Sequence, residues 1–462
     1  MNKIYLLTSC AIFIIAMFIV GQNINKPFWG EHDWNGVRYG NIARNYLRYG
    51  FIETKLGQVE NSGIARVGEF GYYTHYPPLL PILISISYTI FGISEFSTRL
   101  VPLLATSGTI ALIFLIGAYL YNFKIGLLAS LLALATPMVL YFGKNSSHEP
   151  LTTFFILLSF WGYINITKAN RKIFQILFLV GLILAQLTAW AGYFLVPALT
   201  IPLIVKKDWL AVKKLIPYLI LSIILFFVHL IHVTILTGSI SGGNLIGSLM
   251  QRSGISPDVQ PSGFNILGYL DKLRLWFSTL YTATLTLLSF SWLFFKRGKF
   301  EAKDLLIISL GLIGLIYICV FSNSVFIHNY LIFYFLPFLV LSAALCIVSL
   351  MNINFFEHIK ILLPLFIVLI VFFEKRDFLL ALNLSHQDKL AVEIGKAINN
   401  QTKPSDEVLI LPYDYSNSSD RFLKFYSDRR LNFSDSLDLS FDIYVIVNTR
   451  KQTFTLTKKQ NP

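Results

Sequence analysis

Long apolar runs separated by short polar turns are the main pattern of this chain. A membrane-spanning helix needs about 20 mostly apolar residues to cross a hydrocarbon core roughly 30 Å thick. Runs of about this kind cover residues 4–22, 98–121, 125–143, 150–167, 173–190, 191–206, 214–237, 277–295, 304–322, 330–350 and 358–374. The pattern predicts an all-α polytopic membrane domain over residues 1–374, with about eleven transmembrane helices.

The apolar run at 79–92 is too short to be one of these spans. At 1.5 Å per residue, a helix of this length reaches only about 21 Å. We expect it to lie at the membrane interface, within a first outer loop that covers residues 23–97. The charges agree with this choice, because it places the basic turns at 168–172, 206–214 and 296–303 on the inner side of the membrane.

The composition changes after residue 374, where charged residues, Asn and Ser become common. Residues 408–411 and 444–447 are predicted to be buried strands, and 387–399 an amphipathic helix. We expect 375–462 to form a small α/β domain on the extracytoplasmic side.

Composition and charge support a multi-pass protein of the cell (plasma or inner) membrane. Hydrophobic residues make up 55% of the chain and charged residues 14%, whereas soluble proteins average roughly 25% charged. The net charge of +13 does not indicate a nucleic-acid partner, since the basic excess lies mainly in the short inner turns. The three cysteines lie in apolar runs without metal-ligand spacing.

Ionisable residues are rare inside the predicted spans and gather in four outer segments. Ionisable groups at membrane depth are costly and are usually kept for a function. A carboxylate there can accept the proton of an attacking hydroxyl, and cations can neutralise a leaving phosphate. The segments contain Glu31 and Asp33; His75 before Pro77-Pro78; Lys144 to Pro150, with His148 and Glu149; and His328-Asn329-Tyr330.

The first part of the chain contains a series of short motifs in a fixed order. They are Asp33, Arg38-Tyr39, Ile42 to Leu47, His75-Tyr76-Pro77-Pro78-Leu79, and Ser94-Glu95-Phe96 followed by Arg99-Leu100. Motifs in this order and spacing resemble the GT-C membrane glycosyltransferases, in particular the protein O-mannosyltransferase and aminoarabinose transferase branch. The similarity covers roughly residues 1–200 and returns at 328–337, while the rest resembles the family only in architecture.

This resemblance implies a polyprenyl-phosphate sugar donor, a periplasmic or luminal active site, and inversion at the anomeric carbon in a single displacement. The family's essential acid in the first outer loop matches Asp33 best, with Glu31 as the alternative, and its second acid matches Glu149. The aminoarabinose branch has Glu-Lys before its Pro-Pro, where this chain has His75-Tyr76. Another cation would then have to contact the phosphate.

Each candidate also has a purely structural interpretation. Asp33 could cap the helix expected at 35–48, and Glu149 could form a surface ion pair with Lys144 or His148. His75 could hydrogen-bond the backbone before the two prolines, and His328 could be an interfacial anchor.

We therefore expect two groups of site residues. The catalytic candidates are Asp33, Glu31 and Glu149. The substrate-binding candidates are Arg44, His75, Arg99, Lys144, His328 and Tyr330. The loop 238–276, with Arg252 and Asp258, is expected to cover the site as a lid.

The expected partners are a polyprenyl-phosphate sugar donor, a lipid, glycan or protein acceptor such as lipid A, and membrane lipids. No cofactor is certain. The acids and His75 could bind a divalent metal ion, but their spacing has no clean ligand signature.

The alternative function is a transporter or flippase of a lipid-linked or anionic substrate. Such a protein would need acids and bases in mid-span and helices broken near the bilayer centre. Here the ionisable residues lie at the outer ends of the spans, which favours chemistry at the membrane surface.

Overall fold

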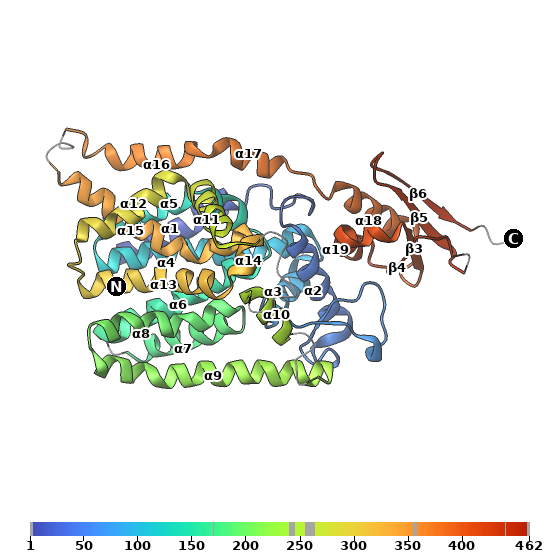
Figure 1. Cartoon of the computed structure of the whole chain (residues 1–462), viewed down its shortest axis with the longest axis horizontal. Helices are drawn as coiled ribbons and strands as arrows, with labels where there is room; N and C mark the ends of the chain where they lie inside the picture. The colour runs from blue at the N-terminus through green and yellow to red at the C-terminus, as the bar shows by residue number, and fades with distance from the viewer. Residues whose placement is uncertain are drawn as a thin grey trace.

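The computed structural model describes residues 3–169, 171–239, 245–254, 264–353, 358–438 and 440–459. Roughly parallel helices form the body of the molecule, and a small domain with a sheet projects from one end of it (Figure 1). The N-terminus lies toward the other end of the body. This architecture confirms the predicted fold class of a helical body with a small C-terminal α/β domain.

Helices of the body follow the predicted spans closely. They are α1 (Lys3–Val20), α2 (Trp34–Glu53), α3 (Leu79–Phe91), α4 (Glu95–Leu120), α5 (Phe123–Leu134), η2 (Met138–Phe142), α6 (His148–Ala169), α7 (Lys172–Gln186), η3 (Trp190–Phe194), α8 (Leu195–Val205), α9 (Trp209–Thr237), α10 (Leu245–Ser253), α11 (Ile266–Leu280), α12 (Ala283–Lys296), α13 (Ala302–Val320), α14 (Ser322–Ile327), η5 (Asn329–Phe335), α15 (Leu336–Met351), α16 (Leu363–Glu374) and α17 (Arg376–Leu384).

Within the described ranges, five helical segments are long and apolar enough to cross a membrane. They are α1, α4, α9, α13 and the continuous pair η5–α15. The predicted span 277–295 differs, since it falls on α11 and α12, which meet at an angle of 108°. Thr282 has a φ of 67° between them, and its hydroxyl accepts a hydrogen bond from the backbone N–H of Leu285. The total of about eleven spans stays a prediction.

The body is built around α4, whose most apolar window is 83% buried. It packs against α1, α5 and α6. A Cβ added at Gly117 of α4 would lie 2.8 Å from the Cα of Gly126 in α5, so glycine allows these two helices to approach closely. By contrast, α9 is only 17% buried and exposes apolar side chains, as expected of a lipid-facing helix.

Three turns with basic residues meet at the end of the body away from the sheet domain. Lys206 after α8 donates a hydrogen bond to the carbonyl of Phe300 (3.1 Å). Lys296 at the end of α12 pairs with Asp304 (2.7 Å), which also accepts a hydrogen bond from Tyr121 after α4 (2.6 Å). Two of the turns that the sequence assigns to the inner side, 206–214 and 296–303, are thus close together, and the turn after α4 lies beside them.

The short helix α3 begins and ends at the opposite end of the body. Before it, the carbonyl of His75 accepts a hydrogen bond from the indole of Trp190 (3.1 Å). After it, Glu95 at the start of α4 accepts a hydrogen bond from Tyr426 of the C-terminal domain (2.8 Å). The chain therefore enters and leaves α3 on the same side, and its placement at a membrane interface stays a prediction.

The C-terminal domain contains a four-stranded sheet in the order β4-β3-β5-β6, in which only β6 is antiparallel to its neighbour. The two predicted strands are β3 and β5, which are central. The outer strands β4 and β6 escape prediction because they are only partly buried and lack an apolar run. The elements are α18 (Lys389–Gln401), β3 (Glu407–Leu411), η7 (Tyr413–Tyr415), α19 (Ser416–Ser427), β4 (Arg430–Phe433), β5 (Ile443–Asn448) and β6 (Thr453–Lys458).

Helix α19 packs against α2 of the first outer loop (Figure 1). Phe28 and Val37 of this loop belong to the hydrophobic core of the C-terminal domain. The same loop also contains a two-stranded sheet of β1 (Gln58–Val59) and β2 (Tyr72–Tyr73), and the 3-10 helix η1 (Val67–Glu69). The expected domain boundary at residue 374 stays a prediction, but the loop and the domain share a core.

Candidate active site

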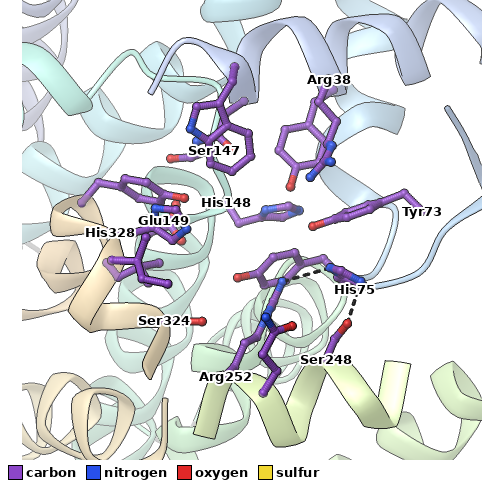
Figure 2. Close-up of a pocket in the computed structure, with 18 of the residues that line it drawn as sticks. Arg38, Tyr73, His75, Ser147, His148, Glu149, Ser248, Arg252, Ser324 and His328 are labelled. Atoms are coloured by element: carbon purple, nitrogen blue, oxygen red, sulfur yellow. Dashed lines mark hydrogen bonds between the residues drawn. The ribbon is translucent and has the colours of Figure 1, made fainter. Parts of the chain in front are cut away.

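A cavity of about 460 Å³ lies where the helical body meets the C-terminal domain. Six segments that are distant in the sequence supply its walls (Figure 2). They contribute Trp34, Asn35, Arg38 and Tyr39 of α2; Tyr73, His75 and Tyr76; Ser147, His148 and Glu149; Ser248, Gln251 and Arg252 of α10; Asn323, Ser324, Ile327, His328, Tyr330 and Leu331; and Arg421 of α19.

Among the described residues that line this cavity, Glu149 is the one carboxylate. It stands in the first turn of α6, where the helix dipole favours a negative charge. The side chain is 2% exposed, and Oε2 has no hydrogen-bond partner among the described residues. Burial raises the pKa of Glu149 to about 7, against the opposing effects of Ser147 and Arg252. Its carboxyl group can therefore take up or release a proton near neutral pH.

His75 is held between two residues of α10, as the dashed lines in Figure 2 show. Its Nδ1 lies 3.4 Å from the guanidinium of Arg252, and its Nε2 lies 2.6 Å from the hydroxyl of Ser248. Because Arg252 can only donate, Nδ1 must accept, and the proton of a neutral ring is then on Nε2. Burial and the nearby Arg252 lower the pKa of His75 to about 3, which agrees with a neutral ring.

Two further guanidinium groups lie near Trp34. Arg38 lies 5.6 Å from the centre of the Trp34 ring and pairs with Glu60 (2.7 Å). Arg421 lies 4.9 Å from the same ring. Neither Arg421 nor Arg252 has an ion-pair partner in the part of the chain that the structure describes. The cavity consequently has an excess of positive charge and suits an anionic ligand.

Histidine and tyrosine rings form much of the remaining wall. The ring of His148 stacks on Tyr76 at 4.2 Å, and His328 lies 5.5 Å from Tyr330. Burial lowers the pKa of both histidines to about 3. Among the described residues, His148 Nε2 and His328 Nδ1 have no hydrogen-bond partner, so each ring has a nitrogen available to a bound molecule.

Asp33 lies on a second, much smaller cavity of about 40 Å³. Its Oδ1 pairs with Arg99 of α4 (3.1 Å), and its Oδ2 accepts hydrogen bonds from the backbone N–H groups of Trp29 (3.2 Å) and Gly30 (2.9 Å). Its side chain does not cap α2. Both carboxylate oxygens are thus engaged in holding the first outer loop and α4 together.

Lys144 lines the smaller cavity together with Asp33 and Arg99. Its ammonium group donates a hydrogen bond to the carbonyl of Leu140 (2.9 Å). Burial and the nearby Arg99 lower the pKa of Lys144 to about 8.

Glu31 and Arg44 line neither of these two cavities. Glu31 accepts a hydrogen bond from Asn329 (3.1 Å), which connects the first outer loop to the segment 328–330. Arg44 pairs with Asp428 (3.2 Å) and donates to the carbonyl of Phe425 (2.9 Å), which connects α2 to α19.

The predicted site residues therefore separate into groups. The larger cavity brings together His75, Glu149, His328 and Tyr330, and the smaller one Asp33, Arg99 and Lys144. Arg38 and Arg421 were not among the predicted site residues. Arg38 belongs to the Arg38-Tyr39 motif of the first outer loop, whereas no motif in the sequence marks Arg421, which lies in the C-terminal domain.

The predicted lid is only partly described. Its helix α10 lines the cavity with Arg252, whereas Asp258 lies outside the described residues. The sequence left open a site for a divalent metal ion. Among the described residues, no three His, Cys, Asp or Glu side chains lie close enough together to bind one.

Known proteins resemble this chain in sequence over one part and in fold over nearly all of it. Residues 75–232 match the family model of dolichyl-phosphate-mannose-protein mannosyltransferase. ArnT from Cupriavidus metallidurans bound to undecaprenyl phosphate superposes with a TM-score of 0.62 at 13% identity, covering 96% of this chain and 92% of that one. No curated protein matches the sequence.

A second structure of similar fold is the oligosaccharyltransferase AglB from Archaeoglobus fulgidus in complex with an inhibitory peptide and a dolichol-phosphate. Its TM-score is 0.58 at 11% identity, covering 94% of this chain and 65% of that one. The resemblance that the sequence motifs indicated is thus confirmed by the family match and at the level of the fold.

Proposed function

We propose that this chain, which has the fold of the GT-C membrane glycosyltransferases, transfers a sugar from a polyprenyl-phosphate donor to an extracytoplasmic acceptor. The observation that carries the proposal is the larger cavity, in which a buried carboxylate with an unpaired oxygen faces several cationic side chains. A carboxylate and cations are what such a transfer requires. The undecaprenyl phosphate on ArnT and the dolichol-phosphate on AglB support a lipid-phosphate donor.

Glu149 is the general base in this proposal. It is the carboxylate of the cavity that has room for a sugar, and its pKa of about 7 suits proton transfer near neutral pH. Asp33 has the better motif match, but its two oxygens are engaged and its cavity of about 40 Å³ is too small for a sugar. We assign Asp33 a positioning role, because it fixes the first outer loop to α4.

The reaction is a single displacement. A hydroxyl or amine of the acceptor attacks the anomeric carbon of the sugar and forms the new bond, while its proton passes to Glu149. The bond between the anomeric carbon and the phosphate oxygen breaks, and polyprenyl phosphate leaves with the electron pair. Attack from the face opposite the phosphate inverts the anomeric carbon.

Arg252 and His75 are suited to hold the phosphate that leaves. Arg252 has no acidic partner among the described residues, and a guanidinium can bind phosphate through two parallel hydrogen bonds. The neutral ring of His75 can donate a hydrogen bond from Nε2–H to the phosphate if its hydrogen bond to the hydroxyl of Ser248 is broken.

An apolar pocket of about 330 Å³ next to this pair suits the lipid tail. It is lined by Trp190, whose indole bonds the carbonyl of His75, and by Leu249, which follows Ser248 on α10. The pocket continues along aromatic residues of η3, along α9, and along the end of α13 with Phe321 directly after it. A polyprenyl chain there would place its phosphate at the mouth of the larger cavity.

The positive-inside rule supports the orientation. The basic turns after α8 and α12 lie at the end of the body away from the cavity, so that end faces the cytoplasm. The cavity and the C-terminal domain are then extracytoplasmic, at the cell (plasma or inner) membrane, where a lipid, glycan or protein acceptor is available.

The bend between α11 and α12 is the feature that most resembles a transporter. However, no residue that lines the larger cavity comes from either of these helices. The bend is therefore not part of the candidate site, and the transferase proposal is preferred.

Lipid profiling of whole cells tests the proposal. Polyprenyl-phosphate sugars are extracted from wild-type cells and from cells in which the gene for this chain is deleted, and are compared by mass spectrometry. Accumulation of one lipid-linked sugar in the deletion cells supports the transferase function and identifies the donor. Identical profiles under conditions in which wild-type cells produce the protein would contradict it.

A further inference from the structure

The C-terminal domain contributes one cation to the larger cavity. Arg421 of α19 has an exposed side chain, and the space that it faces includes this cavity. It lies over Trp34 of α2 at 4.9 Å, so that α2 and α19 meet at this wall. Among the residues that line the cavity, Arg421 is the one that follows residue 331 in the chain.

Helix α19 is held firmly enough to position this side chain. The hydroxyl of Tyr426 accepts a hydrogen bond from the backbone N–H of Phe28 (2.8 Å) and donates one to Glu95 (2.8 Å). Asp428, directly after the helix, pairs with Arg44 (3.2 Å) and Arg48 (2.6 Å). These contacts join α19 to the first outer loop and to the start of α4, so the place of Arg421 does not depend on a single contact.

The three guanidinium groups of the cavity lie in two places. Arg252 lies over Tyr76 at 4.5 Å and contacts His75. Arg421 and Arg38 share Trp34 instead (4.9 and 5.6 Å). In the view of Figure 2, Arg252 and Arg38 are at opposite sides of the drawn cluster, with His148 between them.

The pair at Trp34 has an unbalanced charge. Arg38 is paired with Glu60, but no described acidic side chain pairs with Arg421. Partial burial against its neighbours and the like charge of Arg38 lower the pKa of Arg421, whereas Glu60 raises it. An anion bound between the two guanidinium groups would offset the repulsion between them and could receive bidentate hydrogen bonds.

We propose that Arg421 and Arg38 form a second oxyanion subsite in the cavity, distinct from the one at Arg252 and His75. Its ligand is a phosphate or carboxylate group. This inference rests on the proposed function for the identity of the two substrates, since one subsite receives the donor phosphate and the other an anionic group next to the reacting sugar. That group belongs to the acceptor when the donor has the single phosphate of the proposed function, and to the donor when the leaving group is instead a diphosphate.

Calorimetric titration of the purified full-length protein in detergent tests the subsite. The protein is first saturated with undecaprenyl phosphate and then titrated with inorganic phosphate. We expect one phosphate to bind per loaded protein, and Arg421→Gln to weaken this binding about tenfold or more because it removes a charged donor pair. Arg421→Lys retains the charge but not the planar fork, and is expected to bind with intermediate affinity.

Lys424→Gln is the matched control, because Lys424 lies one turn further along α19, pairs with Asp420 (2.8 Å) and does not line the cavity. Its phosphate affinity should equal that of the wild type. Thermal unfolding verifies that each variant is folded. Absence of phosphate binding to the loaded protein, or unchanged binding in folded Arg421→Gln, would overturn the subsite.

Titration with two lipids then identifies the source of the anion. If Arg421→Gln weakens the binding of undecaprenyl diphosphate but not of undecaprenyl phosphate, the subsite receives the second phosphate of the donor. If it weakens neither lipid while phosphate binding is lost, the anion belongs to the acceptor. If it weakens both lipids equally, Arg421 belongs to a single phosphate site and the proposal of two subsites is wrong.

These outcomes are separate from those that test the transferase function. A deletion strain with an unchanged lipid profile would contradict the transferase proposal, whereas intact phosphate binding at Arg421 would still support the subsite.

Discussion

Burial and an unpaired oxygen give Glu149 the property that a general base needs. Its pKa of about 7 implies that the carboxylate fraction rises with pH around neutrality. We expect the transfer rate of the wild type to increase as the pH rises through about 7. Glu149→Gln should lower the rate by roughly 10²- to 10⁴-fold above pH 7 and remove its dependence on pH, so that the difference from the wild type becomes smaller at acidic pH. A Glu149→Gln protein with the wild-type rate and pH profile would remove Glu149 from the chemistry.

The Glu149 carboxyl should also make the free energy of unfolding depend on pH, and this free energy should fall where the transfer rate rises. Because the pKa of Glu149 is raised on folding, the folded state binds more protons than the unfolded state between about pH 4.5 and 7. Its stabilising contribution is fully present below the unfolded pKa and is lost as the pH rises through about 7. Relative to the wild type, Glu149→Gln should gain on the order of 2–3 kcal/mol between pH 4.5 and pH 8. Thermal unfolding at the two pH values measures the difference, and a gap that does not change with pH would contradict the burial of a titrating carboxyl.

Replacing Asp33 should mainly lower the free energy of unfolding, whereas replacing Glu149 should mainly lower the transfer rate. Asp33→Asn leaves the buried Arg99 without its acid partner, and breaking such a pair costs roughly 3–5 kcal/mol. We expect a clear loss of thermal stability together with retained binding of undecaprenyl phosphate. Asp271→Asn, which breaks the exposed pair with Arg274, should cost less than about 1 kcal/mol. An Asp33→Asn protein that is as stable as the wild type but inactive would restore Asp33 as the base.

At the residue scale, the sequence motifs located part of the candidate site. His75 and Glu149 stand in outer segments where ionisable residues gather, and both line the larger cavity. The motifs favoured Asp33 over Glu149 as the base, because the sequence does not show which carboxylate oxygens are already hydrogen-bonded. Arg421 could not be predicted from the sequence, because it reaches the cavity only through the packing of α19 against α2.

At the scale of elements, the apolar runs located the long apolar helices of the body, because a span needs a continuous apolar stretch that is visible in the sequence. The shorter helices α10 and α17 and most of α11 and α14 lie outside these runs. The break at Thr282 was not predicted, since it depends on a positive φ and a cap that the run of apolar residues conceals. The strands β4 and β6 were missed for the corresponding reason, because partial burial leaves no strong periodic signal.

Helix α10 is the element on which the donor phosphate depends in this account. Arg252→Gln should weaken the binding of undecaprenyl phosphate to the purified protein about tenfold or more, because a charged bidentate donor is lost. Arg274→Gln is the control, since its side chain is 77% exposed and distant from the cavity lining. Equal affinity of both variants and the wild type would exclude Arg252 from the phosphate site.

At the scale of the whole molecule, the active site depends on the contact between the helical body and the C-terminal domain. Asp428 makes two ion pairs across this contact, with Arg44 and Arg48. Asp428→Asn should loosen it, and hydrogen exchange should become faster in the backbone amides of α19. Asp420→Asn, which affects only a pair within α19, should leave these rates near those of the wild type.

If exchange in α19 is unchanged in Asp428→Asn, the apolar contacts of Phe28 and Val37 are sufficient to hold the domain. The two ion pairs of Asp428 would then not be what fixes α19. The placement of the cavity would be unaffected.

The most direct test of the central claim is the lipid profile of cells that produce Glu149→Gln in place of the wild-type protein. The account predicts that they accumulate the same polyprenyl-phosphate sugar as deletion cells, while the purified variant is folded and binds undecaprenyl phosphate normally. Glu393→Gln, an exposed substitution of the same kind on α18, should give the wild-type profile. Glu149→Gln cells with a wild-type lipid profile would contradict the claim that this cavity is where the sugar is transferred.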